Sequence, residues 1–165
     1  MARPGGSKGG KVMGDLSENF SRWEFLCRCG KCEHSKEILV HPKLLKACQT
    51  LRGLEGIGMT INSGARCEAR NKGTPGSAGK SWHIPRVVPW GKTGAEAPVL
   101  HAVDITFSDP TYRTPENIVR LYVRATLLLP PGLALYHGRI HMDFRKRGKW
   151  RDVHAGWSWL NHLTT

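Results

Sequence analysis

The sequence predicts an α+β fold, in which helices pack against a small antiparallel sheet. Apolar residues recur at helical spacing in residues 42–53 and 114–129, whereas shorter alternating or apolar runs predict strands before and after the second helix. With 165 residues, the chain is long enough for one domain with its own core. We expect this domain to span residues 14–153.

Capping residues mark the first helical elements. Ser21, with Glu24 three residues later, predicts the start of a short helical turn. Three apolar residues of this turn are expected to pack on the core: Trp23, Phe25 and Leu26. Pro42, at a first-turn position, opens the next helix, and Gly53 is expected to end it.

The second half of the chain combines strands with one long helix. Strands are expected at residues 59–63, 99–107, 133–136 and 139–144. Thr114 and Pro115 predict the start of a helix that continues to Leu129. His137 and Gly138 are expected to form a tight turn or bulge between the last two strands.

Four segments lack a periodic pattern. Residues 65–81 predict a long functional loop with one helical turn, and residues 84–99, with three Pro and two Gly, predict an inserted loop. Residues 1–13 are mostly Gly, Lys and Arg and predict a disordered basic arm. Residues 154–165 form a Trp-containing C-terminal extension, for which we expect core capping, with glycan or subunit contact as alternatives.

The formal charge of +12 favours anionic partners. The basic runs lie near the chain ends, and no helix clusters Lys or Arg, so we expect no specific nucleic-acid binding. No apolar run approaches the roughly 18 residues of a membrane-spanning helix. No apolar segment of a secretory signal follows the basic start, so we expect synthesis in the cytoplasm without membrane insertion.

The chain has five Cys, three of them in a C-x-C-x-x-C cluster: Cys27, Cys29 and Cys32. These would form a structural zinc site if Cys67 or His34 completes the set. A disulfide between one of them and Cys67 is an equal alternative for a protein that works outside the cell. The third alternative is that these Cys bind no metal and form no disulfide. Cys48 lies in a helical pattern and is expected to be a buried apolar residue.

Three stretches place imidazole and carboxylate groups among apolar residues: Ser81-Trp82-His83, His101-Ala102-Val103-Asp104 and Arg139-Ile140-His141-Met142-Asp143. Two His and one Asp suffice to hold a catalytic zinc ion and leave a fourth position for water. Because the chain has 8 His, spacing alone is a weak signal, and the surrounding residues carry more weight.

These surroundings contain four ordered motifs and a matching opening. Residues 61–71 are similar to "SGYRxxxxN", 81–83 to "SxH", 102–105 to "AxDI", 136–143 to "GxxY…FVHVD" and 16–32 to the opening "NFSxxEFxCxCG". Together they resemble the zinc D-alanyl-D-alanine carboxypeptidases and the related phage endolysins, over about residues 15–150. The resemblance implies a hedgehog/D,D-peptidase fold with a zinc site on the sheet. Hedgehog signalling domains share this fold, so the fold alone does not imply peptidase activity.

The resemblance also implies roles for single residues. His83, Asp104 and His141 would be the zinc ligands. Arg66 would hold a substrate carboxylate or the polarised carbonyl, with Ser81 beside it, and the planar Arg fork suits such a group. Zinc there would lower the pKa of bound water towards about 7 and polarise the scissile carbonyl.

One departure from the family concerns spacing. Twenty residues separate His83 from Asp104, where the family usually has six, and the inserted loop at 84–99 would accommodate the difference. His101 is the spare ligand candidate. Residues three apart in a strand point to opposite faces, so His101 and Asp104 are poorly placed to bind one ion.

A second departure concerns the general base. The family commonly places an acidic residue three positions before the last His, and this chain has Gly138 there. We choose His137 instead, because in a regular strand it would share a face with His141. Arg139 on that face would stabilise an oxyanion, and Asp143 would orient a ligand His or form a structural salt bridge.

We therefore expect a zinc-dependent peptidase that cleaves peptidoglycan stem peptides, as a phage-type lysin or virion enzyme or as a host enzyme whose export signal was trimmed. The preference for D-amino acids comes from the resemblance alone. One alternative is a catalytically inactive zinc-binding module of the same fold, and another is a nucleic-acid-binding protein with the Cys cluster as a zinc knuckle. The sequence does not distinguish carboxypeptidase from L-alanyl-D-glutamate or D,D-endopeptidase activity, and it leaves the oligomeric state open.

Overall fold

The computed structural model describes residues 14–77, 79–92, 94–145 and 150–153. The predicted basic arm (1–13) and C-terminal extension (154–165) lie outside the described residues. The helical elements are α1 (Arg22–Phe25), η1 (Glu33–Ser35), α2 (Pro42–Glu55), α3 (Glu68–Lys72), η2 (Pro110–Tyr112) and α4 (Pro115–Thr126). The strands are β1 (Leu39–Val40), β2 (Met59–Ser63), β3 (Arg86–Trp90), β4 (Ala95–Leu100), β5 (Ala102–Phe107), β6 (Gly132–Tyr136), β7 (Arg139–Asp143) and β8 (Trp150–Val153).

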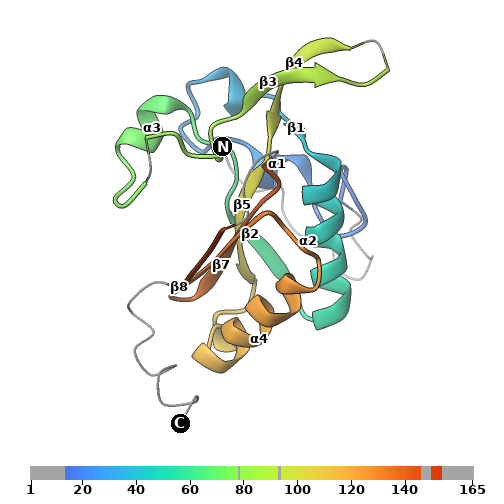
Figure 1. Ribbon diagram of the computed structural model, residues 1–165, viewed down its shortest axis with the longest axis vertical. Helices are drawn as coiled ribbons and strands as arrows, with labels where there is room; N and C mark the ends of the chain where they lie inside the picture. The colour runs from blue at the N-terminus through green and yellow to red at the C-terminus, as the bar shows by residue number, and fades with distance from the viewer. Residues whose placement is uncertain (1–13, 78, 93, 146–149, 154–165) are drawn as a thin grey trace, which may run out of the picture.

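The larger sheet has five strands in the order β2-β5-β7-β6-β8 (Figure 1). Its first four strands pair antiparallel, and β8 joins β6 in parallel. A smaller sheet in the order β1-β4-β3 lies at one end of the molecule. This arrangement, with helices packed on a mainly antiparallel sheet, confirms the predicted α+β class.

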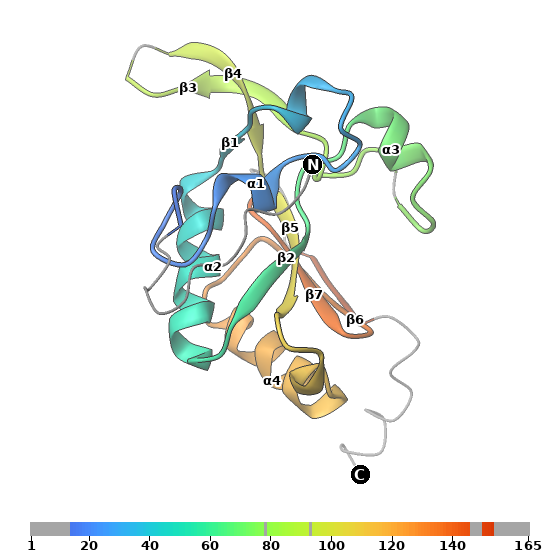
Figure 2. The ribbon, with the colours of Figure 1, turned by 180° about the vertical axis from the view of Figure 1, so that it is seen from behind.

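Helices α2 and α4 cover one face of the larger sheet (Figure 2). Each helix buries an apolar stripe: Leu44, Ala47, Cys48 and Leu51 on α2, and Ile118, Leu121 and Ala125 on α4. Alternate strand residues meet them, among them Val103 and Ile105 of β5 and Ile140 and Met142 of β7. Because side chains alternate along a strand, the residues between these positions lie on the face away from the helices. That face is therefore available for a site.

The segment predicted as an inserted loop forms a β-hairpin instead. Strands β3 and β4 pair antiparallel, and the hairpin extends away from the body of the molecule (Figures 1 and 2). Pro89 and Pro98 hide the strand pattern in the sequence. Strand β3 is an edge strand, and β1 pairs with β4 only at Val99 and Leu100, so neither Pro breaks a continuous ladder. The predicted strand 99–107 is correspondingly divided at His101 into the end of β4 and all of β5.

Two predicted helix ends differ from the structure. Helix α2 continues past Gly53 to Glu55 and is capped by Gly56, whose φ of 64° is the left-handed conformation that favours glycine. Helix α4 ends at Thr126 and not at Leu129.

The predicted turn at Ser21 is present, with the Ser21 amide donating to the Glu24 carboxylate at 2.9 Å. Phe25 in this turn is buried, but Trp23 is 56% exposed and does not pack on the core as expected.

No helix within residues 14–77, 79–92, 94–145 and 150–153 is both long and apolar enough to cross a membrane.

Candidate metal centre and active site

Two of the three predicted metal ligands are direct neighbours across the sheet. Asp104 on β5 pairs with His141 on β7, and both side chains are buried on the face away from the helices. Cβ atoms of directly opposed residues lie about 4.5–5.5 Å apart, which brings a carboxylate and an imidazole within reach of one ion. The strand register thus brings two of the three candidate ligands together.

The third ligand, His83, comes from the loop between α3 and β3. Its Nδ1 donates a hydrogen bond to the carbonyl of Gly64 at 2.8 Å, and its own carbonyl accepts from the Arg66 amide at 2.8 Å. Gly64 must be glycine for packing reasons, since a Cβ there would lie 2.5 Å from the backbone oxygen of Phe25. The end of β2 therefore passes close to α1 and still offers a carbonyl to His83.

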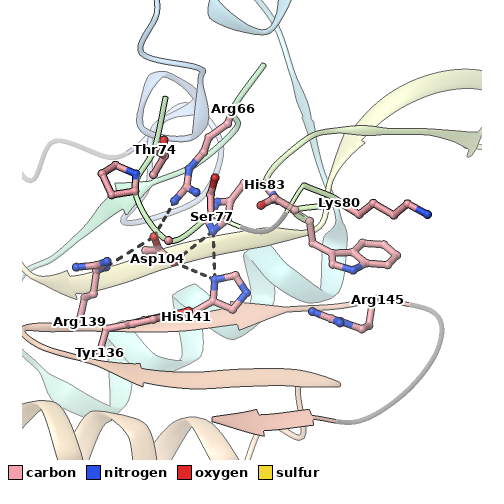
Figure 3. Close-up of a pocket in the computed structure, with 14 residues that line it drawn as sticks. Arg66, Thr74, Ser77, Lys80, His83, Asp104, Tyr136, Arg139, His141 and Arg145 are labelled. Carbon is pink, nitrogen blue, oxygen red and sulfur yellow. Dashed lines mark hydrogen bonds and ion pairs between the residues drawn. The ribbon is translucent and has the colours of Figure 1, made fainter. Parts of the chain in front are cut away.

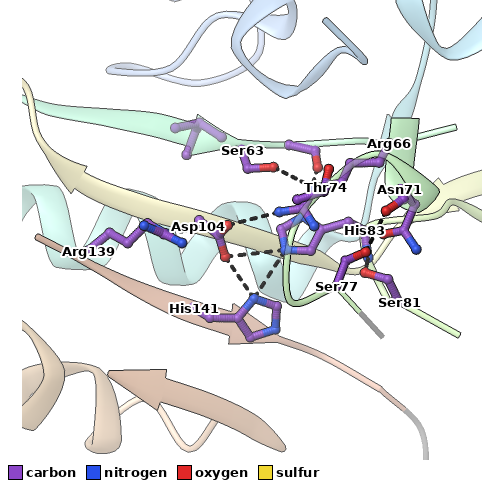
Figure 4. Close-up of polar contacts among 12 residues, drawn as sticks. Ser63, Arg66, Asn71, Thr74, Ser77, Ser81, His83, Asp104, Arg139 and His141 are labelled. Atoms are coloured by element: carbon purple, nitrogen blue, oxygen red, sulfur yellow. Dashed lines mark hydrogen bonds and ion pairs between the residues drawn. The ribbon is translucent and has the colours of Figure 1, made fainter. Parts of the chain in front are cut away.

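The three candidate ligand atoms face one another at nearly equal distances (Figure 4). His141 Nδ1 lies 2.9 Å from Asp104 Oδ1 and 3.1 Å from His83 Nε2, and His83 Nε2 lies 3.3 Å from Asp104 Oδ1. In a tetrahedral zinc site with bonds of about 2.0–2.1 Å, ligand atoms lie about 3.3 Å apart. The donor set and its spacing fit zinc, with one position left open.

Hydrogen bonds to the other ring nitrogens select the tautomers that metal binding needs. Because His83 Nδ1–H donates to Gly64, its Nε2 carries the lone pair that faces the centre. His141 Nε2 lies 3.3 Å from Asp143 Oδ2, so a neutral ring that donates there presents its Nδ1 lone pair. Asp143 is held in turn by Arg145, whose Nε lies 2.6 Å from Asp143 Oδ1.

Burial and neighbouring charges shift the pKa of each ligand. Burial lowers the pKa of His83, which keeps the ring neutral as a ligand must be. Burial also opposes ionisation of Asp104 and of His141, but the contacts of Asp104 with His83 and His141, and those of His141 with Asp104 and Asp143, prevail. The pKa of Asp104 is therefore held well below its usual range, and the pKa of His141 is raised.

His101, the spare candidate, lies elsewhere. It is buried, its Nδ1 contacts the carbonyl of Val99 at 3.0 Å, and its ring packs 5.0 Å from that of His41. It is not part of the group that His83, Asp104 and His141 form. The hairpin that separates His83 from Asp104 in the chain projects outward and lets the two meet.

A comparison with known protein families agrees with this geometry. The family described as peptidase M15 matches residues 18–143, which is more than half of the 165-residue chain. The chain belongs to the peptidase M15 family. This confirms the family resemblance that the motifs indicated, and M15 peptidases are zinc-dependent. A search of the curated proteins and a search of the solved structures each returned no match.

Within this M15 peptidase, Arg66 lies beside the candidate metal ligands (Figure 3). Its Nε donates to Ser63 Oγ at 3.0 Å, and one terminal nitrogen lies 3.1 Å from Asp104 Oδ2. Arg66 thus orients the ligand carboxylate, a role that the resemblance did not imply. Ser81 is buried nearby, and its hydroxyl accepts from the His83 amide at 3.3 Å.

The centre opens into a pocket of about 560 Å³. The lining residues are Arg66, Thr74, Pro75, Gly76, Ser77, Lys80, Ser81, Trp82, His83, Asp104, Tyr136, Arg139, His141 and Arg145. Four of these carry a positive charge, whereas Asp104 is the one carboxylate among the described lining residues. The pocket of this M15 peptidase is therefore suited to an anionic ligand.

Arg139 lies at the site as predicted, but His137 does not. The Arg139 guanidinium lies over the Tyr136 ring at 5.0 Å, and its Nε is 3.7 Å from Asp104 Oδ2. His137 is exposed in the two-residue turn between β6 and β7 and is not among the described lining residues. The premise of a regular strand through residue 137 is wrong, because Gly138 adopts a φ of 73° and ends the pairing at Tyr136 and Arg139.

The structure shows further site residues that sequence reasoning did not assign. The Gly64 carbonyl, Tyr136, Trp82 and Lys80 all contact the ligands or line the pocket. A side-chain pattern cannot reveal a backbone acceptor such as Gly64. Tyr136 could have been assigned from the sequence, because it is the Tyr of the family motif "GxxY…FVHVD".

The predicted cysteine cluster is also present. Cys27, Cys29, Cys32 and Cys67 form a second group whose ligand atoms lie within 4.8 Å of one another, and His34 is not part of it. All are free thiols, as is buried Cys48. Burial raises the pKa of Cys27 to about 11, whereas a hydrogen bond with Ser35 leads the contacts that lower the pKa of Cys29 to about 5.

Proposed function

We propose that this chain is a zinc-dependent peptidase that cleaves the stem peptides of peptidoglycan, acting at the bacterial cell wall as a phage-type lysin or a cell-wall hydrolase. The observation that carries the proposal is the group of His83, Asp104 and His141, whose ligand atoms converge at the base of an open pocket. Membership of a peptidase family supports hydrolysis of a peptide bond. The bacterial substrate rests on the family resemblance and on the charge of the pocket.

His83, Asp104 and His141 would hold a zinc ion. When bound, the ion would act as a Lewis acid that polarises a carbonyl and lowers the pKa of a coordinated water. The protein residues would do the rest. Arg66 fixes Asp104 Oδ2 and so directs Oδ1 to the ligand cluster. Arg66 and Arg139 both reach the pocket, where a guanidinium would stabilise the negative charge that develops on the carbonyl oxygen.

Pocket charge supports a stem-peptide substrate. These peptides carry free carboxylates, and Arg66, Lys80, Arg139 and Arg145 surround the centre with positive charge. An Arg fork can bind a carboxylate through two parallel hydrogen bonds. A carboxylate-bearing peptide would therefore be attracted to the pocket and oriented in it.

One observation favours a second candidate, a zinc-binding module of the same fold without turnover. Asp104, a candidate metal ligand, is the sole carboxylate among the described residues that line the pocket, and the position where the family commonly carries an acidic residue is Gly138. Hydrolysis needs a group that accepts a proton from water and passes it to the leaving amine. Such a module would bind the cell wall or a protein partner through the same cationic pocket.

Mass spectrometry of digests separates the two candidates. Zinc-loaded protein is incubated with purified peptidoglycan, and the same reaction is run with a chelator and with the His141→Ala variant, whose fold is checked by circular dichroism. We expect a defined peptide-bond cut that both controls abolish, and the bond identifies the protein as a carboxypeptidase or an endopeptidase. Intact peptide bonds on several wall types, with stoichiometric zinc at His83, Asp104 and His141, would leave the binding module as the function.

A further inference from the structure

A second cluster of metal-binding side chains lies outside the pocket. The Sγ atoms of Cys29 and Cys67 are 3.9 Å apart, and the four thiols of the cluster lie within 4.8 Å of one another. In a tetrahedral site with Zn–S bonds of about 2.3 Å, two sulfurs lie about 3.8 Å apart. We propose that Cys27, Cys29, Cys32 and Cys67 bind a structural zinc ion, and that this ion holds the segment carrying Arg66 in place.

The backbone around the cluster is arranged to stabilise thiolates. The amides of Lys31 and Cys32 both point to Cys29 Sγ at 3.4 Å, and Gly30, with a φ of 70°, makes the tight turn that returns them. The Cys67 amide contacts Cys27 Sγ at 3.4 Å. Donated N–H groups favour the charged form of a sulfur, which is the form that binds metal.

Besides the cluster, a few hydrogen bonds hold the surrounding segment, among them that of the Arg28 guanidinium to the Ile61 carbonyl at 2.6 Å and that of the Cys27 amide to the His34 carbonyl at 2.8 Å. Between the buried residues Cys27 and Ile38, no described side chain is buried, and the only regular element is the three-residue η1. Cys29 and Cys32 pack only partly buried against the core. A stretch with no fully buried side chain is held more firmly by a further constraint, and a metal site that binds only the folded chain supplies one. The four thiols connect this segment to the start of α3.

The surface next to the cluster suits a tetrathiolate site. Four thiolates around one Zn²⁺ leave a net charge of −2, and Lys31 and Arg70 line the same surface hollow of about 430 Å³ as three of the Cys. The hollow also gives an ion a path to the sulfurs. Soft thiolate ligands in this geometry select zinc over harder cations.

The position of Cys67 connects the cluster to the active site. Cys67 directly follows Arg66, whose amide donates to the His83 carbonyl at 2.8 Å. Ala65 donates to the carbonyl of Phe25, two residues before Cys27, at 2.8 Å. A metal ion bound to both Cys27 and Cys67 would thus fix the chain next to Phe25 and the chain next to Arg66. It would hold residues 65–67, whose backbone contacts Phe25 and His83, in place.

Cobalt substitution tests the site without any assay of peptidase activity. Full-length protein is prepared without metal and titrated with Co²⁺, and sulfur-to-cobalt charge-transfer absorption reports thiolate ligands. We expect two metal ions per chain, one of them with this absorption. The Cys29→Ser variant should lose the absorption and one ion, and the His141→Ala variant should keep the absorption and lose the other ion. The matched control, Cys48→Ala, should bind both ions.

Two results would overturn the proposal. One is wild-type protein that binds Co²⁺ without sulfur charge transfer, and the other is a thiol titration of the purified protein that finds Cys67 in a disulfide. The positioning claim has its own readout in hydrogen exchange. Amides of residues 64–70 should exchange faster in Cys29→Ser than in Cys48→Ala, and equal rates would show that the ion does not hold the Arg66 segment. A peptidase-inactive protein that passes these tests would contradict only the proposed function.

Discussion

At the residue scale, the candidate zinc ligands are prepared by groups that do not touch the metal position. The Gly64 carbonyl fixes the tautomer of His83, and the Asp143 carboxylate contacts Nε2 of His141. Arg145 in turn holds Asp143, and Arg66 holds the far oxygen of Asp104. Each imidazole is thereby oriented, so little conformational freedom is lost when an ion binds.

We predict that Asp143→Asn weakens zinc binding at this centre by about 10–100-fold, because the amide loses the charge that makes His141 a stronger donor. Competition titration against a zinc-binding dye measures the affinity. Asp109→Asn is the matched control, since Asp109 lies at the surface in the turn before η2. Equal affinities for Asp143→Asn and the wild type would show that the contact with His141 does not support the ligand.

We also predict that zinc affinity at this centre rises with pH. The pKa of His141 is raised above its ordinary value of 6.5, because hydrogen bonds to Asp104 and Asp143 outweigh burial. Below that raised pKa the ring carries a proton on Nδ1 that zinc must displace, and above it the proton is absent. Affinity should increase by up to about tenfold per pH unit until the pKa of His141 is passed, then level off. Calorimetric titrations from about pH 5.5 to 8 test this, and a flat affinity would contradict it.

How much of the site the sequence reveals also differs by residue. Asp104 and His141 were predicted as ligands from the family motifs, and the structure places them opposite each other on neighbouring strands. His137 was misplaced because its choice as base assumed a regular strand through residue 137, whereas the structure has the turn that the sequence also predicted at His137 and Gly138. The contact of Arg66 with Asp104 could not be predicted, because it joins the loop after β2 to β5 across the fold, and no residue pattern marks it.

At the element scale, strands and helices with clear apolar periodicity could be predicted, whereas the hairpin could not. The two helices that cover the sheet have capping residues and apolar stripes, and both were expected. The β3–β4 hairpin contains Pro89 and Pro98. A Pro argues against a strand unless it is known which side of that strand pairs with a neighbour. That pairing is a property of the sheet and not of the local sequence.

Helix α4 should contribute to stability through its buried stripe. Leu121 is fully buried in the core, so Leu121→Ala should lower the free energy of unfolding by about 2–5 kcal/mol. Val123, on the same helix, is 55% exposed, and Val123→Ala should cost well under about 1 kcal/mol. Urea denaturation of the zinc-loaded proteins measures both values. Similar losses for the two variants would contradict the packing of α4 on the sheet.

At the scale of the whole molecule, the fold places a cationic pocket over a buried ligand cluster. Helices cover one face of the larger sheet, and the other face carries Asp104 and His141. The loop after α3 carries His83 over that face. The long insertion between His83 and Asp104 folds into the β3–β4 hairpin, which projects away from the body of the molecule. The N-terminal segment and the start of α3 meet at the cysteine cluster, beside the residue that orients Asp104.

We propose that this pocket hydrolyses stem peptides and that a zinc ion at His83, Asp104 and His141 is required for the hydrolysis. The most direct measurement is cleavage of a synthetic stem peptide by one protein sample in three states: as zinc-loaded, after removal of metal, and after zinc is returned. We expect a cut at one defined bond in the first and third states and no cut in the second. Cleavage that persists without metal, or no cleavage by zinc-loaded protein with an intact centre, would contradict it.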